Sequence, residues 1–303
     1  MKKLALLFAA LLVASCGEKS SPEGSESASE KPTAEPSADA TQETEKPLTL
    51  PLSDADVERL LEAAVDLDSL NERDGLLYQV SKSEPFSGWA KEMYDSGQAK
   101  GLARFNDGKL EGPYTTWREN GQKKGEGFYK DGKMEGLCIE WYASGQKRLE
   151  RTFKDGKRHG LRTEWNADGR KSIEATYKEG EPDGVFTAWH KNGQKQAEET
   201  WKDGKKIGLD IRYFTDGQKW IETTYNKEGE LNGPSTTWHT NLQKRSEESW
   251  KDGKKDGLFL EWHANGQKMY ESTYKDGELI SEKWWNAKGE EVETRKEARG
   301  YTH

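Results

Sequence analysis

Three histidines at matching positions are the residues in this sequence best placed for metal chemistry. His190, His239 and His263 each follow an aromatic residue directly. Imidazole is the side chain that most often ligates transition metals. If the three lie on successive β-hairpins, however, neighbouring positions are about 10 Å apart, and bonds of about 2 Å to one zinc ion cannot span that gap. We therefore expect no metal site and no bound cofactor.

Other groups capable of catalysis are similarly isolated. Adjacent carboxylates occur at Glu198-Glu199 and Glu247-Glu248, but neighbours on a strand point to opposite faces and cannot act as an acid–base pair on one substrate. Cys138 has no partner for a disulfide or a Cys-based zinc site, because the only other cysteine is Cys16. Nucleophile elbows and phosphate-binding loops are missing from the sequence. We expect a protein that is not an enzyme.

The elements that carry these residues repeat with a period of about 24 residues. Each of eight copies opens with a glycine and has a large side chain five positions later, with one extra residue in the copy that begins at Gly208. A strict period of this length indicates a repeat architecture in which each unit buries surface against its neighbours. The opening glycines are Gly88, Gly112, Gly136, Gly160, Gly184, Gly208, Gly233 and Gly257.

Each copy has the pattern of a β-hairpin. In the copy at Gly136, Leu137, Ile139 and Trp141 alternate with smaller or polar residues, which is the period of a strand. Asp155-Gly156 then marks a tight hairpin turn, and Asp-Gly or Asn-Gly recurs in other copies. The fold class predicted for the chain is therefore all-β, an elongated single-sheet array of antiparallel β-hairpin repeats with a short N-terminal helix.

The aromatic residues form two rows, one on each strand of the hairpin, and we expect both rows on the same face. The opposite face is predicted to be Glu, Lys, Arg and Thr in contact with water. The rings have two interpretations: they hold the sheet together, or they form a platform that stacks on sugars or quaternary ammonium groups. The candidate binding residues are the first-strand tryptophans Trp117, Trp141, Trp165, Trp189, Trp238 and Trp262.

The N-terminal segment is predicted to be a targeting signal. Met1-Lys2-Lys3 precedes an apolar run from Leu4 to Val13, which is too short to cross a bilayer. The run ends in Ala14-Ser15-Cys16 and resembles a bacterial lipobox, which implies cleavage before Cys16 and acylation of its thiol. We expect residues 1–15 to be a lipoprotein signal peptide, and the protein to be lipid-anchored in the bacterial cell envelope, at the outer membrane in a Gram-negative cell.

The remaining boundaries follow from composition. Residues 16–50 form an acidic tether rich in Ser, Pro and Glu, without apolar periodicity. Residues 51–87 contain a helix from about 54 to 66, with Ser53 as its N-cap, and a lead-in strand at 76–80. The eight repeats fill residues 88–281, and residues 282–303 form a partial repeat that caps the array, with a charged tail.

Charge and composition limit the partners. The chain has a net charge of −8, and phosphate binding needs concentrated Lys and Arg, so we expect no nucleic-acid partner. Charged residues make up 34% and hydrophobic residues 32%, so any core is thin and aromatic. We expect a protein partner in the envelope, contact with the membrane through the lipid anchor alone, and glycan as an alternative ligand.

The phrase Gly-x-x-x-x-Trp-x-x-x-Gly-Gln-Lys, followed by an aromatic residue and Lys-Asp-Gly-Lys-x-x-Gly, resembles the variant MORN repeat. The segment from Gly75 to Gly88 resembles the start of bacterial proteins grouped as the YwqK family of toxin–antitoxin antitoxins. The resemblance implies a MORN-type hairpin scaffold for protein–protein interaction, with an antitoxin-like or immunity-like role. Leu242 and Ser281, which stand where other copies have glycine, and Met93, which replaces an aromatic residue, depart from the pattern.

Overall fold

The computed structural model describes residues 52–300 and divides into two compact units between Gly121 and Gln122. The described parts of the units are residues 52–121 and 122–300, called unit 1 and unit 2 below. The predicted signal peptide, Cys16 and the tether to residue 50 lie outside the described residues. Within both units the chain is dominated by antiparallel strands, which confirms the all-β hairpin array.

Unit 1 begins with helix α2 (Asp54–Ala63), close to the predicted segment. The Ser53 hydroxyl accepts a hydrogen bond from the backbone N–H of Asp56, 3.1 Å away, and so caps the first turn as the sequence predicts. The helix ends earlier than predicted because Ala64 is already extended and Val65 pairs with Ala90.

The strands of unit 1 form a small mixed sheet and a separate hairpin. β1 (Val65–Asp66) runs parallel to β4 (Gly88–Met93), which pairs with β5 (Ala99–Asn106) and then with β6 (Lys109–Trp117) in antiparallel fashion. After the short 3-10 helix Leu67–Ser69, β2 (Leu70–Arg73) and β3 (Leu76–Gln79) form their own two-stranded sheet. The predicted lead-in strand is therefore present, but its partner is β2.

The core of unit 1 lies between the helix and this sheet. Leu52, Leu60 and Ala64 form one buried cluster with Leu102 and Trp117. Val57, Leu61, Trp89 and Ala99 pack against the same cluster. Because these partners come from β4, β5 and β6, the apolar stripe of α2 covers side chains of several strands at once.

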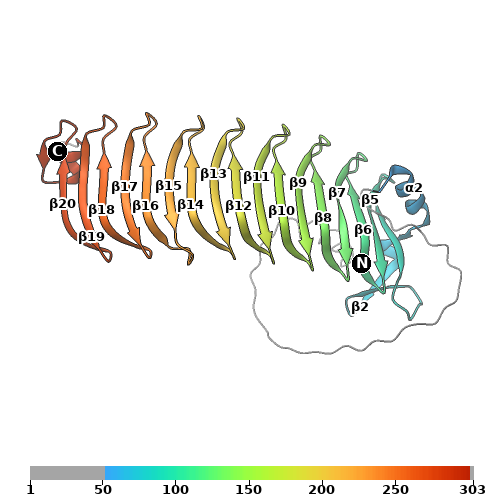
Figure 1. Cartoon of the computed structure of the whole chain (residues 1–303). Helices are drawn as coiled ribbons and strands as arrows, with labels where there is room; N and C mark the ends of the chain where they lie inside the picture. Colours follow the sequence, from blue (N-terminus) through green and yellow to red (C-terminus); the bar gives the residue numbers. More distant parts are fainter. Residues whose placement is uncertain (1–51, 301–303) are drawn as a thin grey trace, which may run out of the picture. The chain divides into compact units, whose positions relative to one another are not determined.

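Unit 2 is an antiparallel sheet in which each strand pairs with the next one along the chain. Figure 1 shows these strands side by side in chain order. Their bounds are β7 (Lys123–Lys130), β8 (Lys133–Trp141), β9 (Lys147–Lys154), β10 (Lys157–Trp165), β11 (Lys171–Lys178), β12 (Glu181–Trp189), β13 (Lys195–Lys202), β14 (Lys205–Tyr213), β15 (Lys219–Tyr225), β16 (Leu231–Trp238), β17 (Lys244–Lys251), β18 (Lys254–Trp262), β19 (Lys268–Lys275), β20 (Glu278–Trp285) and β21 (Glu291–Val292).

The predicted tight turns are present along one edge of unit 2. Asp155 has φ 50° and Gly156 has φ 81°, and two successive positive φ values are those of a type I′ turn. The opening glycine of a copy lies at a bulge and not at a turn. The pairing of β9 with β10 skips from Arg158 to Arg162 around Gly160, where a bulge interrupts the ladder.

Departures from the repeat remain local. The extra residue of the copy at Gly208 lies in the loop between β15 and β16, where the Asn226 side-chain oxygen accepts the backbone N–H groups of Glu228 and Glu230. Leu242 takes a positive φ of 71° at a turn position where other copies have glycine.

The end of unit 2 has a cap that the sequence predicts only in outline. β21 pairs with β20 at two positions, and helix α3 (Arg295–Ala298) follows. Thr294 and Glu297 form a reciprocal capping box at the start of α3. This helix was not predicted, although Thr-x-x-Glu is its usual signature.

Candidate functional site

The two aromatic rows lie on opposite faces of unit 2, so the prediction of a single aromatic face is wrong. Phe153 is directly paired with Gly136, and directly paired residues share a face. Trp141 lies five residues after Gly136, and an odd step along a strand leads to the other face. We call the face with the second-strand rings face A and the face with the first-strand rings face B. The rings of face A are Phe153, Tyr177, Trp201, Tyr225, Trp250 and Tyr274, and those of face B are Trp141, Trp165, Trp189, Tyr213, Trp238 and Trp262.

Face B is nearly the same in every copy. A lysine at the start of each second strand forms an ion pair with the glutamate three residues later, as in Lys171–Glu174 at 2.5 Å. Threonine or serine follows two residues after that glutamate in nearly every copy. The ion pairs of this ladder are Lys123–Glu126, Lys147–Glu150, Lys171–Glu174, Lys195–Glu198, Lys219–Glu222, Lys244–Glu247 and Lys268–Glu271.

The candidate tryptophans of unit 2 are half-buried within this ladder: Trp141, Trp165, Trp189, Trp238 and Trp262. The ammonium of Lys147 lies 5.9 Å from the centre of the Trp165 ring, a cation–π distance. Lys147 therefore occupies one side of the Trp165 ring, on which a ligand would stack. Trp117 differs from the others: it is 8% exposed and belongs to the core beneath α2 in unit 1.

The three histidines connect successive hairpins. Nε2 of His239 lies 3.0 Å from the backbone oxygen of Trp262, and His190 and His263 make the same contact with Tyr213 and Trp285. A backbone oxygen can only accept, so Nε2 is the nitrogen that carries a proton and donates this bond. Tyr142 has the equivalent position and donates its hydroxyl to the oxygen of Trp165. The shared phase of the histidines thus has a structural cause.

The turns on the same edge are linked in a second way. The side-chain amide of Asn192 donates to the oxygen of Thr215, and those of Asn241 and Asn265 donate to Ala264 and Ala287. Each bond joins a turn to the corresponding turn one copy later. Hairpins of unit 2 are therefore held together by side chains as well as by their strand ladders.

Face A changes from copy to copy. Two residues after the opening glycine, the successive side chains are Cys138, Arg162, Phe186, Asp210, Ser235 and Phe259. Opposite them stand Arg151, Ala175, Glu199, Thr223, Glu248 and Ser272. From the sequence, Cys138, Glu199 and Glu248 were considered only for catalysis and these two columns were not grouped, although aligning the eight copies column by column would have found them.

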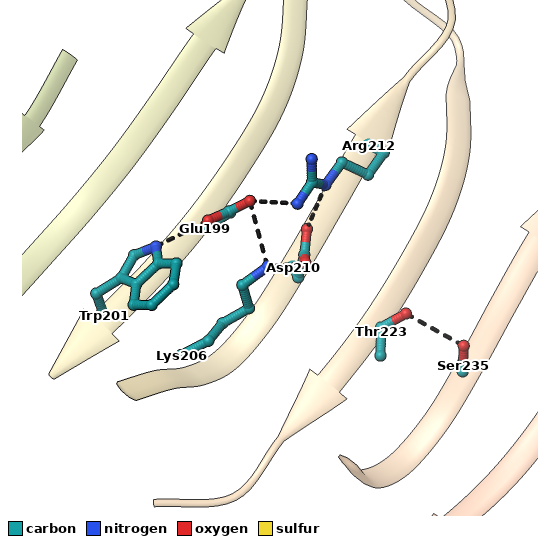
Figure 2. Close-up of polar contacts among 7 residues, drawn as sticks. All are labelled: Glu199, Trp201, Lys206, Asp210, Arg212, Thr223 and Ser235. Atoms are coloured by element: carbon teal, nitrogen blue, oxygen red, sulfur yellow. Dashed lines mark hydrogen bonds and ion pairs between the residues drawn. The ribbon is translucent and has the colours of Figure 1, made fainter. Parts of the chain in front are cut away.

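A buried charge cluster occupies the middle of face A, on β13 and β14 (Figure 2). Glu199 accepts hydrogen bonds from the Trp201 indole N–H at 2.8 Å and from Arg212. Lys206 lies 3.3 Å from Glu199 and 2.6 Å from Asp210, and the Arg212 Nε donates to Asp210 at 3.1 Å. Two acids and two bases thus neutralise each other, while the Arg212 side chain remains partly exposed.

The cluster gives way to hydroxyl groups in the next copy. Thr223 and Ser235 are within 3.1 Å of each other, and Thr237 and Ser246 within 2.7 Å. Beyond them, burial raises the pKa of Glu248, and the neighbouring Lys255 opposes that rise. Face A therefore presents charged, hydroxyl-lined and aromatic patches in turn along the sheet.

An aromatic patch follows at the C-terminal end of face A. The Lys255 ammonium lies 4.1 Å from the centre of the Phe259 ring and also lies over Trp250 and Tyr274. Tyr270 stacks on Trp284 with ring centres 3.9 Å apart. Such a patch offers Trp and Tyr side chains of the kind enriched in the centres of protein interfaces.

Other candidate chemistry can be located within residues 52–300. Cys138 is buried, with 2% of its surface exposed. That segment has no group of three or more His, Cys, Asp or Glu residues arranged to hold a metal ion. None of the helices described for this chain is long and apolar enough to span a membrane.

Four segments of the chain match the family model of the MORN repeat variant: residues 110–131, 134–155, 182–203 and 255–276. Each match begins two residues before an opening glycine and ends at the acidic residue of a tight turn. The hairpins described above are therefore MORN-variant repeats at these four places. A search of curated protein sequences finds no match to the chain.

Proposed function

We propose that this chain is an envelope-anchored lipoprotein whose repeat sheet binds a protein partner through face A of unit 2. Its role is that of a binding scaffold and not of a catalyst. The resemblance at the start of the repeats suggests a partner of the toxin class, which would make the chain immunity-like.

The observation that carries this proposal is the contrast between the two faces. Side chains that all copies share serve what all copies need, namely strand pairing and the contact between neighbours. Side chains that differ at the same position and remain partly exposed, such as Arg162, Phe186 and Ser235, are not needed for that common task. A surface that is different at every step along the array can distinguish one partner from another.

The chemistry of face A supports a protein as that partner. It offers Trp201, Trp250 and Arg212, residue types enriched among the side chains that dominate protein–protein binding energies. Its charges are balanced by pairs such as Lys206–Asp210, so the face lacks the concentrated positive charge that a polyanion needs. Balanced charges fixed in position favour selection of a partner with the complementary pattern.

Photo-crosslinking tests the proposed face. A photoreactive residue is placed at 162, 186 or 212 on face A, or at 176, 200 or 224 on face B, in the full chain expressed in its native envelope. We expect one protein to be recovered from the face A positions and identified by mass spectrometry. Recovery from face B positions alone, or from neither face, would contradict the proposal.

Acylation is tested separately. Labelling with an alkyne-tagged fatty acid is expected to mark the full chain and to be lost in Cys16→Ser, which should also release the protein from the membrane fraction. Unchanged labelling and fractionation of Cys16→Ser would contradict the lipid anchor while leaving the binding face untouched.

The alternative function is recognition of glycans or lipid headgroups by the first-strand tryptophans. It predicts that an added oligosaccharide or a choline headgroup quenches the fluorescence of Trp141, Trp165 and Trp189. The protein-binding proposal predicts no such change, because these rings are half-buried and Lys147 already lies over the Trp165 ring.

A further inference from the structure

Face B of unit 2 carries a row of aliphatic side chains that strand pairing leaves 43% to 61% exposed. They occur one residue after the opening glycine, and Pro234 has the same position in another copy. We call them the aliphatic row: Leu137, Leu161, Val185, Leu209 and Leu258.

For most of its length the row is continuous because threonines fill the strands between its members. Leu161 is directly paired with Thr176, and Val185 with Thr200. Threonine adds a methyl group, so from β8 to β16 apolar atoms follow one another at each strand spacing of about 4.8 Å, and Ser249 on β17 interrupts the row before Leu258. A regular apolar strip that the fold leaves in water indicates a surface used for binding.

Unit 1 shows what such a strip binds. There the corresponding face is covered by α2, whose Leu60 and Ala64 pack with Leu102 and Trp117. Trp89, which has the position of Leu137 in its own copy, packs against the same cluster and is partly buried there. The strand position that is exposed in unit 2 is therefore in contact with the helix-covered cluster in unit 1.

Helix geometry fits the spacing of the row. Successive members lie two strands apart, about 9.6 Å. Seven residues of an α-helix rise about 10.5 Å. A helix that lies across the strands therefore brings one side chain per heptad over each member of the row, with a drift of about 1 Å per step that flexible leucine side chains can absorb.

The ion pairs beside the row determine which residues the partner helix has on either side of its apolar stripe. Beneath α2, the ladder positions are occupied by Ala99 and Leu102 in place of lysine and glutamate. In unit 2 they are ion pairs such as Lys171–Glu174, and burying these without compensation is unfavourable. The occupant must therefore have a narrow apolar stripe with charged residues on its flanks.

We propose that the aliphatic row binds an α-helix of a partner protein that has an apolar residue in every heptad and charged flanks. The helix lies across the strands on face B and needs neither the charge cluster nor the aromatic patch of face A. This inference is separate from the function proposed above, because it concerns the opposite face.

A designed peptide tests the proposal directly. The probe is a four-heptad helix of Ala, Glu and Lys with one leucine per heptad, labelled for fluorescence anisotropy. The control peptide has the same composition, but its leucines are spread around the helix. We expect saturable binding of the probe to the full chain, and binding of the control peptide at least tenfold weaker.

Variants of the chain then locate the site. Leu161 and Val185 are 50% and 61% exposed, so L161E/V185E should fold normally and weaken probe binding at least tenfold. Leu279 and Ile280, 47% and 63% exposed and outside the row, give the matched control L279E/I280E, which should bind as the wild type does. If L161E/V185E loses its far-UV strand spectrum, the milder L161N/V185T takes its place.

Several results would overturn the inference. These are equal binding of the two peptides, no binding of either, or equal weakening by the two double variants. Sedimentation velocity provides one more test: self-association of the full chain that L161E/V185E abolishes would assign the row to a second copy of the chain. Failure here would leave the face A crosslinking result unaffected.

Discussion

At the scale of single residues, glutamates on the two faces differ in burial and therefore in how much they contribute to stability. Glu222 on face B forms a half-exposed pair with Lys219, whereas Glu199 on face A is buried among Lys206, Arg212 and Trp201. Exposed pairs contribute little to stability, but removing one member of a buried group leaves its partners without compensation.

Glu199→Gln should therefore lower the free energy of unfolding by about 1–3 kcal/mol. The matched variant Glu222→Gln should lower it by less than about 1 kcal/mol. Urea unfolding followed by tryptophan fluorescence measures both. Equal losses of unfolding free energy in the two variants would show that the buried carboxylate on face A contributes no more to stability than the exposed one on face B.

Tyr213 offers a test of face B by pH. Burial, together with the hydrogen bond that its hydroxyl donates to Glu198, raises the pKa of Tyr213 to about 12. The folded state thus favours the neutral phenol, and this stabilisation is complete below the unfolded pKa of about 10 and is lost as the pH rises towards 12.

The difference in absorbance at 295 nm between the wild type and Tyr213→Phe isolates this titration from that of the other tyrosines. We expect its midpoint near pH 12. A midpoint near 10 would mean that the hydrogen bond to Glu198 does not persist in solution.

At the scale of elements, each hairpin depends on backbone conformations that only some residues adopt easily. Leu242 has φ 71° and an exposed side chain, at a turn position where glycine is usual in this chain. Such a φ costs a non-glycine residue about 1–2 kcal/mol. Replacement by glycine removes this strain, but glycine loses more conformational entropy on folding, which offsets part of the gain.

Leu242→Gly should consequently raise the stability by about 0.5–1 kcal/mol. The reverse change in another copy, Gly145→Leu, should lower it, because Gly145 has φ 84°. Thermal unfolding by circular dichroism compares the two. A lower melting temperature for Leu242→Gly would mean that the leucine makes a stabilising contact that outweighs its strain.

The sequence predicts these elements well where the signal is local. Ser53 caps α2, Asp155-Gly156 forms the expected turn, and the strand alternation is present in every copy. The relation between strands was harder to predict. The two aromatic rows were assigned to one face because the pairing of Phe153 with Gly136 depends on cross-strand register, which alternation within each strand does not determine.

The candidate site shows the same limit. The first-strand tryptophans were singled out because they are large and periodic, and periodicity marks what the fold requires. The side chains that differ between copies, Asp210, Arg212 and Thr223 among them, do not stand out singly in the sequence. They are identified as a group once the structure places them on one face.

At the scale of the whole molecule, the direction of each strand depends on whether the repeat copies that precede it are complete. Each copy begins and ends at the same edge of the sheet, so one copy can be removed without reversing any strand. Repeat proteins of this kind owe their stability to units and to contacts between neighbours.

Deletion of residues 160–183, one full period, should leave a folded chain with the same strand spectrum and a smaller urea m-value, because less surface is exposed on unfolding. Deletion of residues 157–170 removes β10 and the turn that follows it, so the direction of every later strand is reversed, and it should abolish cooperative unfolding. If the two deletion variants unfold with the same cooperativity, the 24-residue copies are not the units on which stability depends.

The side-chain amides that link successive turns are also sites at which deamidation would weaken the sheet edge. In Asn192-Gly193 and Asn265-Gly266, the following backbone nitrogen can attack the side-chain amide carbon and release ammonia, which forms a succinimide. Water then opens this ring and leaves aspartate or isoaspartate. The new carboxylate would face the oxygen of Thr215 or Ala287, to which the lost amide donated. Two acceptors repel where a donor and an acceptor had paired. Spontaneous hydrolysis would therefore loosen this edge turn by turn, whereas the Asp-Gly edge has no amide to lose.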